Sequence, residues 1–314
     1  MIIESMGWAL MADFPERRLD DGDLPSLFAA ADRTSLSGQQ RYTGAVIWRS
    51  WLAVAAAASG IAAWRVGSQR VDVLAIITMV ILLALLLVEV YLRSSKPNGA
   101  WYDGRAVAES VKSLTWRYAV RASPFEELSD AQDKRFLNAL EQLLKDVKLA
   151  SPISAGTQST ISESVRTLRH SHAEVRKAVY VRDRIDDQRE WYARKAAFNQ
   201  KRASAWGIGL LVVEGMGIVA AFLKVIGVID FDLAGVVAAL IGVGATRLSL
   251  RQYSTNGRAY FFASEELSIA RARLDSVDCT QPNADETWGA EAADAEEAIS
   301  REHTMWRASR SRPE

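Results

Sequence analysis

Four apolar stretches, arranged as two close pairs, dominate the pattern of hydrophobic and polar positions along the chain. They cover residues 45–64, 71–92, 205–229 and 233–248. Crossing the hydrocarbon core of a bilayer takes about 20 helical residues, a length that three of the stretches reach and the fourth narrowly misses. Only a few residues connect the members of each pair, which predicts two membrane-spanning helical hairpins, 45–92 and 205–248.

The composition of these stretches favours lipid over a soluble core. The segment VDVLAIITMVILLALLLVEVYL at 71–92 is apolar on all sides, with acids only near its ends. Aromatic residues typical of membrane interfaces accompany the hairpins: Trp48, Trp51, Trp64, Tyr91 and Trp206. We therefore predict an all-α membrane protein with four transmembrane helices in two hairpins, extended by cytoplasmic amphipathic helices.

The distribution of basic residues predicts the orientation, because short cytoplasmic segments are enriched in lysine and arginine. The flanks of the second hairpin carry Arg194, Lys195, Lys201, Arg202, Arg251 and Arg258. Its loop region has Lys224, offset by Asp230 and Asp232. The first hairpin is less asymmetric, with Arg33, Arg41, Arg93, Lys96 and Arg105 outside and Arg65 and Arg70 in the loop. Both termini and the long middle segment are expected in the cytoplasm.

The segments outside the hairpins are predicted to be mostly helical. Apolar residues recur at helical spacing at Val107, Val111, Leu114 and Tyr118, and again at Phe136, Leu140, Leu143, Leu144 and Val147. Pro124 and the sequence SPISAGTQST at 151–160 interrupt the helices. A long helix over 162–202 is expected to enter the third span, and a cytoplasmic helix over 257–274 to follow the fourth.

The chain contains an internal repeat. Each hairpin is followed by the triplet Gly-Arg-Ala, at 104–106 and at 257–259, near the start of an amphipathic helix that bears an acid. The same order of hairpin, exit and helix indicates duplication of one module. We divide the chain into an N-terminal tail (1–24), a first module (25–150), a second module (151–275), and an acidic helix with a C-terminal tail (276–314).

Four segments flanking the hairpins carry a family resemblance. They are LPSLFAAADRTSLSGQQRY at 24–42, WYDGRAVAESVKSLTWRYAVRASPF at 101–125, YVRDRIDDQREWYARKAAFN at 180–199 and ISREHTMWRASR at 299–310. In these segments the chain resembles the SLATT family, the SMODS- and SLOG-associating two-transmembrane effector domains, in two tandem copies.

The resemblance implies a bacterial inner-membrane effector of anti-phage or other conflict systems, which forms pores or perturbs the membrane when a signal arrives. It implies a cytoplasmic nucleotide sensor or signalling enzyme as a partner, and no catalytic residues. We also expect self-association into a homo-oligomer, because four spans in one chain enclose little more than packed side chains.

Ionisable residues within the spans are the candidate pore or gating groups. Glu214 lies near the middle of the third span, where a carboxylate costs several kcal/mol unless it is protonated, paired or facing water. It either lines a pore or forms a neutral hydrogen bond between helices. Glu89 and Arg49 either pair across the first hairpin or each extend to the interface, and extension to the interface is also expected of Arg247.

Two further sets of residues are candidates for packing and recognition. Small residues allow close helix approach, within one subunit or between subunits: Ala234, Ala238, Gly242 and Thr246, then Gly215 and Gly217, then Ala55, Ser59 and Ala63. An aromatic and basic string either binds a cytoplasmic signal or partner or packs against the helices at 101–121 and 258–274 with its basic residues facing lipid phosphates. Its members are Tyr180, Arg182, Arg184, Gln188, Trp191, Tyr192, Lys195 and Asn199, of which Arg182, Arg184, Gln188, Trp191 and Tyr192 are the candidates for the binding surface.

Other chemistry is not indicated. The formal net charge is zero, which removes the electrostatic argument for nucleic acid, and the single cysteine, Cys279, excludes an intrachain disulfide. His170 and His172 are two residues apart, so on a helix their imidazoles do not converge on a metal. No cofactor or enzymatic site is predicted. The alternatives to a triggered effector are a constitutive ion channel or transporter and a membrane-anchored scaffold without conduction.

Overall fold

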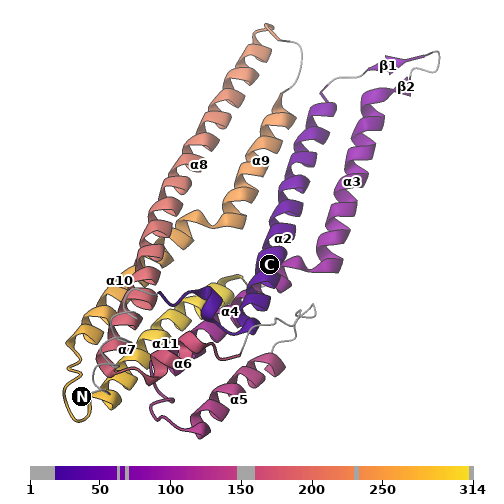
Figure 1. The fold of residues 1–314 in the computed structure, drawn as a ribbon. Coiled ribbons are helices and arrows are strands. Elements are labelled where there is room, and N and C mark those ends of the chain that lie inside the picture. Colours follow the sequence, from indigo (N-terminus) through magenta and orange to yellow (C-terminus); the bar gives the residue numbers. More distant parts are fainter. Residues whose placement is uncertain (1–17, 62–63, 68–70, 147–159, 230–232, 311–314) are drawn as a thin grey trace. The chain divides into compact units, whose positions relative to one another are not determined.

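The computed structural model describes residues 18–61, 64–67, 71–146, 160–229 and 233–310. Predictions that concern Ala63, Arg70, Val147, Asp230, Asp232 and most of the 151–160 loop lie outside the described residues. The described chain is helical almost throughout (Figure 1), which confirms the predicted all-α class apart from one short β-ribbon.

The first half of the chain begins with a short 3-10 helix, η1 (Asp21–Asp23), and the long helix α2 (Ser26–Ser59). Two-residue strands β1 (Arg65–Val66) and β2 (Val71–Asp72) follow, antiparallel, with Arg65 opposite Asp72. Helices α3 (Val73–Ser95), α4 (Pro97–Ala119) and α5 (Asp130–Asp146) complete this half. The β-ribbon was not predicted, because the short connection indicated only a tight hairpin between two helices.

The second half contains α6 (Glu163–His170), α7 (Ala173–Tyr180), the π-helical turn η2 (Val181–Asp186) and α8 (Asp187–Val225). Helices α9 (Ala234–Arg251), α10 (Tyr253–Ser276) and α11 (Ala284–Arg310) follow. The long helix expected over 162–202 is interrupted, because Ser171 and His172 both adopt extended backbone conformations. From Ala173 onward one helical stretch continues to Val225.

Helix α8 ends where the backbone needs a left-handed residue. Gly227 has a φ of +75°, and its N–H donates to the carbonyl of Lys224. The N–H of Val228 donates to the carbonyl of Leu223, which completes a Schellman cap. The sequence Ile-Gly-Val therefore terminates the third apolar stretch.

Within the described residues, three helical stretches are long and apolar enough to cross a membrane: Val73–Ala119, Ala173–Val225 and Ala234–Ser276. Their most apolar windows are 0%, 0% and 6% buried, so these side chains need an apolar environment that the chain itself does not provide. The predicted stretch 45–64 is not among them in the described part of the chain. Its helix ends at Ser59, and its apolar part contains Arg49 and many weakly apolar alanines. The prediction of four spans is thus not confirmed.

The chain divides into two units. We call residues 1–37, 99–195 and 259–314 the helical unit, and residues 38–98 and 196–258 the hairpin unit. The core of the helical unit is aromatic. Tyr118 stacks on Phe136 and meets Phe125 edge-on, while Tyr180 meets Trp116 and Trp288 edge-on. Burial and a hydrogen bond to Asp133 raise the pKa of Tyr118 to about 12.

Candidate functional site

The first hairpin contains a charge pair. Arg49 Nη1 in α2 lies 2.9 Å from Glu89 Oε2 in α3, and Glu89 Oε1 lies 2.9 Å from Arg93 Nε. Of the two alternatives left open by the sequence, the structure shows pairing across the hairpin. Ser59 and Thr78 add a hydrogen bond of 2.8 Å between the hydroxyls of the same two helices. Such polar contacts hold membrane helices together when water is absent.

Glu214 is exposed on α8, within the most apolar part of the helix. Among the described residues, no hydrogen bond or ion pair of its side chain is found. Gly215 beside it is also open, because an added Cβ would have no atom within 4 Å. A carboxyl group in this position would face lipid in a single chain, which costs several kcal/mol.

The second hairpin is joined by close contacts at glycines. A Cβ on Gly217 of α8 would lie 2.8 Å from Val237 Cγ1 in α9, and one on Gly244 of α9 would overlap Leu210 of α8. The guanidinium of Arg247 lies over the Trp206 ring at 5.1 Å. The predicted packing role of Gly217 therefore has a structural counterpart within one chain.

Three of the small residues predicted to pack on α9 lie on its exposed face. Ala234, Ala238 and Gly242 are exposed, and a Cβ added to Gly242 would have no atom within 4 Å. The face of α9 that meets α8 instead contains Val237 and Gly244. Val237 is one residue from Ala238 in the sequence, and Gly244 is two residues from Gly242. The spacing of small residues in the sequence does not by itself show which of two adjacent faces of a helix packs against its neighbour.

The predicted recognition string divides between the interior and the surface. Arg184 and Tyr192 are buried, so neither can form part of a free binding surface. Trp191 and Tyr192 pack against Tyr260, with ring centroids 5.4 and 5.8 Å apart, as the packing alternative predicts. Arg182 is partly exposed and donates to Asp183, which raises the pKa of Arg182. Gln188 lies at intermediate exposure.

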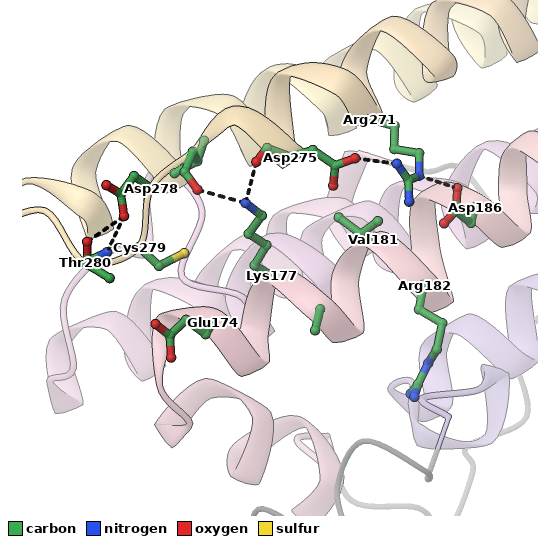
Figure 2. Close-up of a pocket in the computed structure, with 12 residues that line it drawn as sticks. Glu174, Lys177, Val181, Arg182, Asp186, Arg271, Asp275, Asp278, Cys279 and Thr280 are labelled. Atoms are coloured by element: carbon green, nitrogen blue, oxygen red, sulfur yellow. Dashed lines mark hydrogen bonds and ion pairs between the residues drawn. The ribbon is translucent and has the colours of Figure 1, made fainter.

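The helical unit contains a pocket of about 490 Å³ that the sequence analysis missed (Figure 2). One wall follows a helical stripe of α7 and η2, and the other is formed by the end of α10 and the segment after it. The charged lining residues are Glu174, Lys177, Arg182, Asp186, Arg271, Asp275 and Asp278. The spacing of Glu174, Lys177, Val181 and Arg182 was the one signal in the sequence that could have indicated a shared face.

All three cations that line this pocket, Lys177, Arg182 and Arg271, have partners. Lys177 Nζ donates to the carbonyls of Asp275 and Val277, both at 2.8 Å, and so caps the C-terminal end of α10. Arg271 Nε donates to Asp186 at 2.8 Å. Figure 2 shows the Cys279 side chain turned toward the same space, and burial raises the pKa of its thiol. Among the described residues, no group of three or more potential ligands could hold a metal ion.

In the described part of the helical unit three arginines are buried, and the sequence predicted an interior position for none of them. Arg169 donates to the carbonyls of Tyr118, Phe125 and Glu127 and thereby holds the connection between α4 and α5. Arg176 pairs with Asp285, and Arg184 with Glu296. Burial alone would lower the pKa of Arg184, but the Glu296 carboxylate raises it above its ordinary value.

Family comparison accounts for nearly the whole chain. Residues 25–177 match the family SMODS and SLOG-associating 2TM effector domain 3, and residues 180–306 match domain 1 of the same series. The chain belongs to the SLATT family. It carries two tandem SLATT domains, as the resemblance in the flanking segments predicts. No curated protein and no solved structure matches the chain.

The two SLATT domains share a backbone device at the exit of each hairpin. Lys96 after α3 and Gln252 after α9 have positive φ values of 40° and 47°, and each turns the chain directly into the next helix. The repeated glycines then approach the helix that enters the same hairpin. A Cβ on Gly104 would lie 2.7 Å from Ser35 N in α2, and one on Gly257 would lie 3.5 Å from Gln200 N in α8. Both contacts agree with the predicted duplication.

Proposed function

We propose that this tandem SLATT protein is a membrane effector that permeabilises or depolarises the bacterial inner membrane when a signal arrives in the cytoplasm. Both hairpins cross the bilayer, and the termini and the helical unit lie in the cytoplasm. The protein acts without catalysis in an anti-phage or similar conflict response. Its family of two-transmembrane effector domains supports this assignment.

One observation carries the proposal. The helical stretch Ala173–Val225 lines the pocket at its beginning and contains Glu214 in its apolar part. A continuous helix transmits movement along its length, because each backbone hydrogen bond couples residues one turn apart. A signal that alters the pocket can therefore alter the position of the carboxyl group. The signal shifts the protein from a closed to a conducting arrangement only if it binds the conducting arrangement more tightly.

A pathway for ions across the membrane requires several copies of the chain. Glu214 has no partner among the described residues, and the small residues Ala234, Ala238 and Gly242 are exposed. Self-association would place Glu214 in a shared, hydrated interior and would let the small residues of neighbouring helices meet. A nucleotide sensor or signalling enzyme in the cytoplasm would supply the trigger.

Ion flux tests the proposal. The purified full-length protein is reconstituted into potassium-loaded liposomes at increasing protein-to-lipid ratios, and potassium efflux is recorded. Without the signal, we expect tight vesicles at low protein density and efflux that rises more steeply than the density, because crowding drives the formation of the conducting oligomer. Efflux in direct proportion to density would favour a constitutive channel of fixed size. Vesicles as tight as protein-free controls at every density would favour a scaffold.

A further inference from the structure

Helix α11 connects the two SLATT domains. It belongs to the second family match, yet it contacts residues of both. The indole N–H of Trp288 donates to the carbonyl of Val120 at 2.8 Å, and the N–H of Ser123 donates to the carbonyl of Gly289 at 3.0 Å. Further along the helix, the carboxylate of Glu296 accepts hydrogen bonds from Arg184 and Tyr180. The helix thus joins the end of α4 to α7 and η2.

The seat of α11 is rich in arginine. Arg117, Arg121, Arg176 and Arg184 all contact the helix. They meet two carboxylates: Asp285 pairs with Arg121 and Arg176, and Glu296 pairs with Arg184 at 2.8 and 2.9 Å. Arg117 donates to the carbonyl of Ala293 at 3.1 Å. In these direct contacts, four arginines of the seat therefore meet two carboxylates of α11.

Three of these arginines each have a buried N–H group without an acceptor among the described residues. Arg117 Nε, Arg176 Nε and Arg184 Nη1 are buried without a partner in the described part of the chain. Each buried N–H that lost its water on docking weakens the docked state, because desolvation is not repaid by a protein acceptor. The docked position of α11 is therefore less favourable than its number of ion pairs suggests.

Few large apolar side chains are buried in residues 284–300, the part of α11 whose side chains the structure describes. The buried face of this part consists largely of alanines, Ala284, Ala292, Ala295 and Ala298, with Trp288 and Ile299 as the large buried side chains. Burial of an alanine methyl group contributes little hydrophobic free energy compared with a leucine or phenylalanine. This described part of the helix is consequently held by a few anchors, of which the buried Arg184–Glu296 pair is one.

From these contacts we infer that α11 is a releasable latch. Docked in its arginine-lined seat, it joins the two SLATT domains in one unit. Released, it removes the contacts that run through α11 and leaves the direct ring contact between Trp116 and Tyr180, so that the connection between the two domains is weaker. The consequence for the hairpins rests on the proposed function: release would favour the conducting arrangement. The latch itself concerns only the docking of α11 and is testable without flux.

Hydrogen–deuterium exchange of the full-length protein in detergent tests the latch. In Glu296→Gln, Arg184 loses its counter-charge in a buried site, so exchange of the amides of 284–299 should rise roughly tenfold or more. The amides of α4, α7 and the start of α8 should keep the wild-type rate. Glu297→Gln, which changes an exposed acid one residue away, is the matched control and should exchange as the wild type does.

Two results would overturn the inference: unchanged exchange in α11, or an equal rise throughout the helical unit, since either means that α11 does not open as a separate element. If Glu296→Gln does not fold, Asp285→Asn serves instead, because Asp285 is half-exposed and lies near the first turn. Potassium efflux of the same variant separates the two proposals. Selective opening without added efflux supports the latch and contradicts its regulatory consequence.

Discussion

Gly104 of α4 lies directly against the backbone of Ser35 in α2. A Cβ at position 104 would come within 2.7 Å of Ser35 N and 2.8 Å of Ala31 O. Backbone atoms inside a helix cannot yield as a flexible side chain can. The hydroxyl of Ser35 also donates to the carbonyl of Trp101 at 3.1 Å, so the two helices are fixed at the same crossing.

This contact predicts the effect of Gly104→Ala. The added methyl group should force the helices apart and lower the free energy of unfolding by about 1–3 kcal/mol. Gly99→Ala is the matched control, because nothing lies within 4 Å of its Cβ position in the same helix. That control should be neutral or stabilising by up to about 1 kcal/mol. Denaturation followed by circular dichroism measures both, and equal effects would contradict the close crossing.

Arg169 predicts a different kind of sensitivity. Its guanidinium donates to three carbonyls and lies 4.3 Å from the Tyr118 ring. Arg169→Lys keeps the charge but cannot reach all three acceptors, so stability should fall by about 2–4 kcal/mol. Arg166→Lys, at a side chain 48% exposed and 3.6 Å from Asp133, should change stability by less than about 0.5 kcal/mol. A tolerated Arg169→Lys would show that the carbonyls are satisfied in another way.

The single cysteine gives a pH-dependent measurement. Burial raises the pKa of the Cys279 thiol, so less thiolate is present at neutral pH than for an ordinary cysteine. Alkylation by iodoacetamide should therefore be slower in the folded protein, and the midpoint of its pH profile should lie above that of the chain denatured in detergent. A folded-state midpoint at or below the denatured value would contradict the burial of this group.

The topology of the first hairpin is the part of the proposal with the weakest sequence signal. Val66 lies in the exposed strand β1, so a Val66→Cys variant places a reactive thiol in the connection of the first hairpin. The variant then contains two thiols, the new one and that of the native Cys279. With a membrane-impermeant maleimide on intact spheroplasts, Val66→Cys should be labelled and Cys279 should not. Labelling of Val66→Cys only after permeabilisation would show that the first hairpin does not cross.

The sequence predicts the structure correctly where one contribution, such as hydrophobicity, outweighs the others. The stretch that became α3 is apolar on all sides, and no soluble packing could cover it, so its exposure in the structure follows from composition. The stretch before it contains Arg49 and many alanines, so hydropathy and burial compete and the result is ambiguous. The repeated glycines were predictable because they recur in the same order.

The arginine seat could not be predicted in the same way. Arg184 and Glu296 are 112 residues apart in the sequence, and each has the composition of an exposed helix around it. Charged residues are almost never fully buried unless paired, and pairing between distant segments leaves no periodic signal. The pocket at α7 depends likewise on the segment after α10, whose position follows from tertiary packing.

Conductance across a planar bilayer tests the central claim most directly, with the wild type compared with Glu214→Gln under a potassium chloride gradient. At a protein density that causes efflux from liposomes, the account predicts discrete current steps whose reversal potential indicates selectivity for potassium over chloride. It predicts a reversal potential closer to zero in Glu214→Gln, because the carboxylate that attracts cations is gone. The absence of current steps from the wild type, or identical reversal potentials in the two proteins, would contradict it.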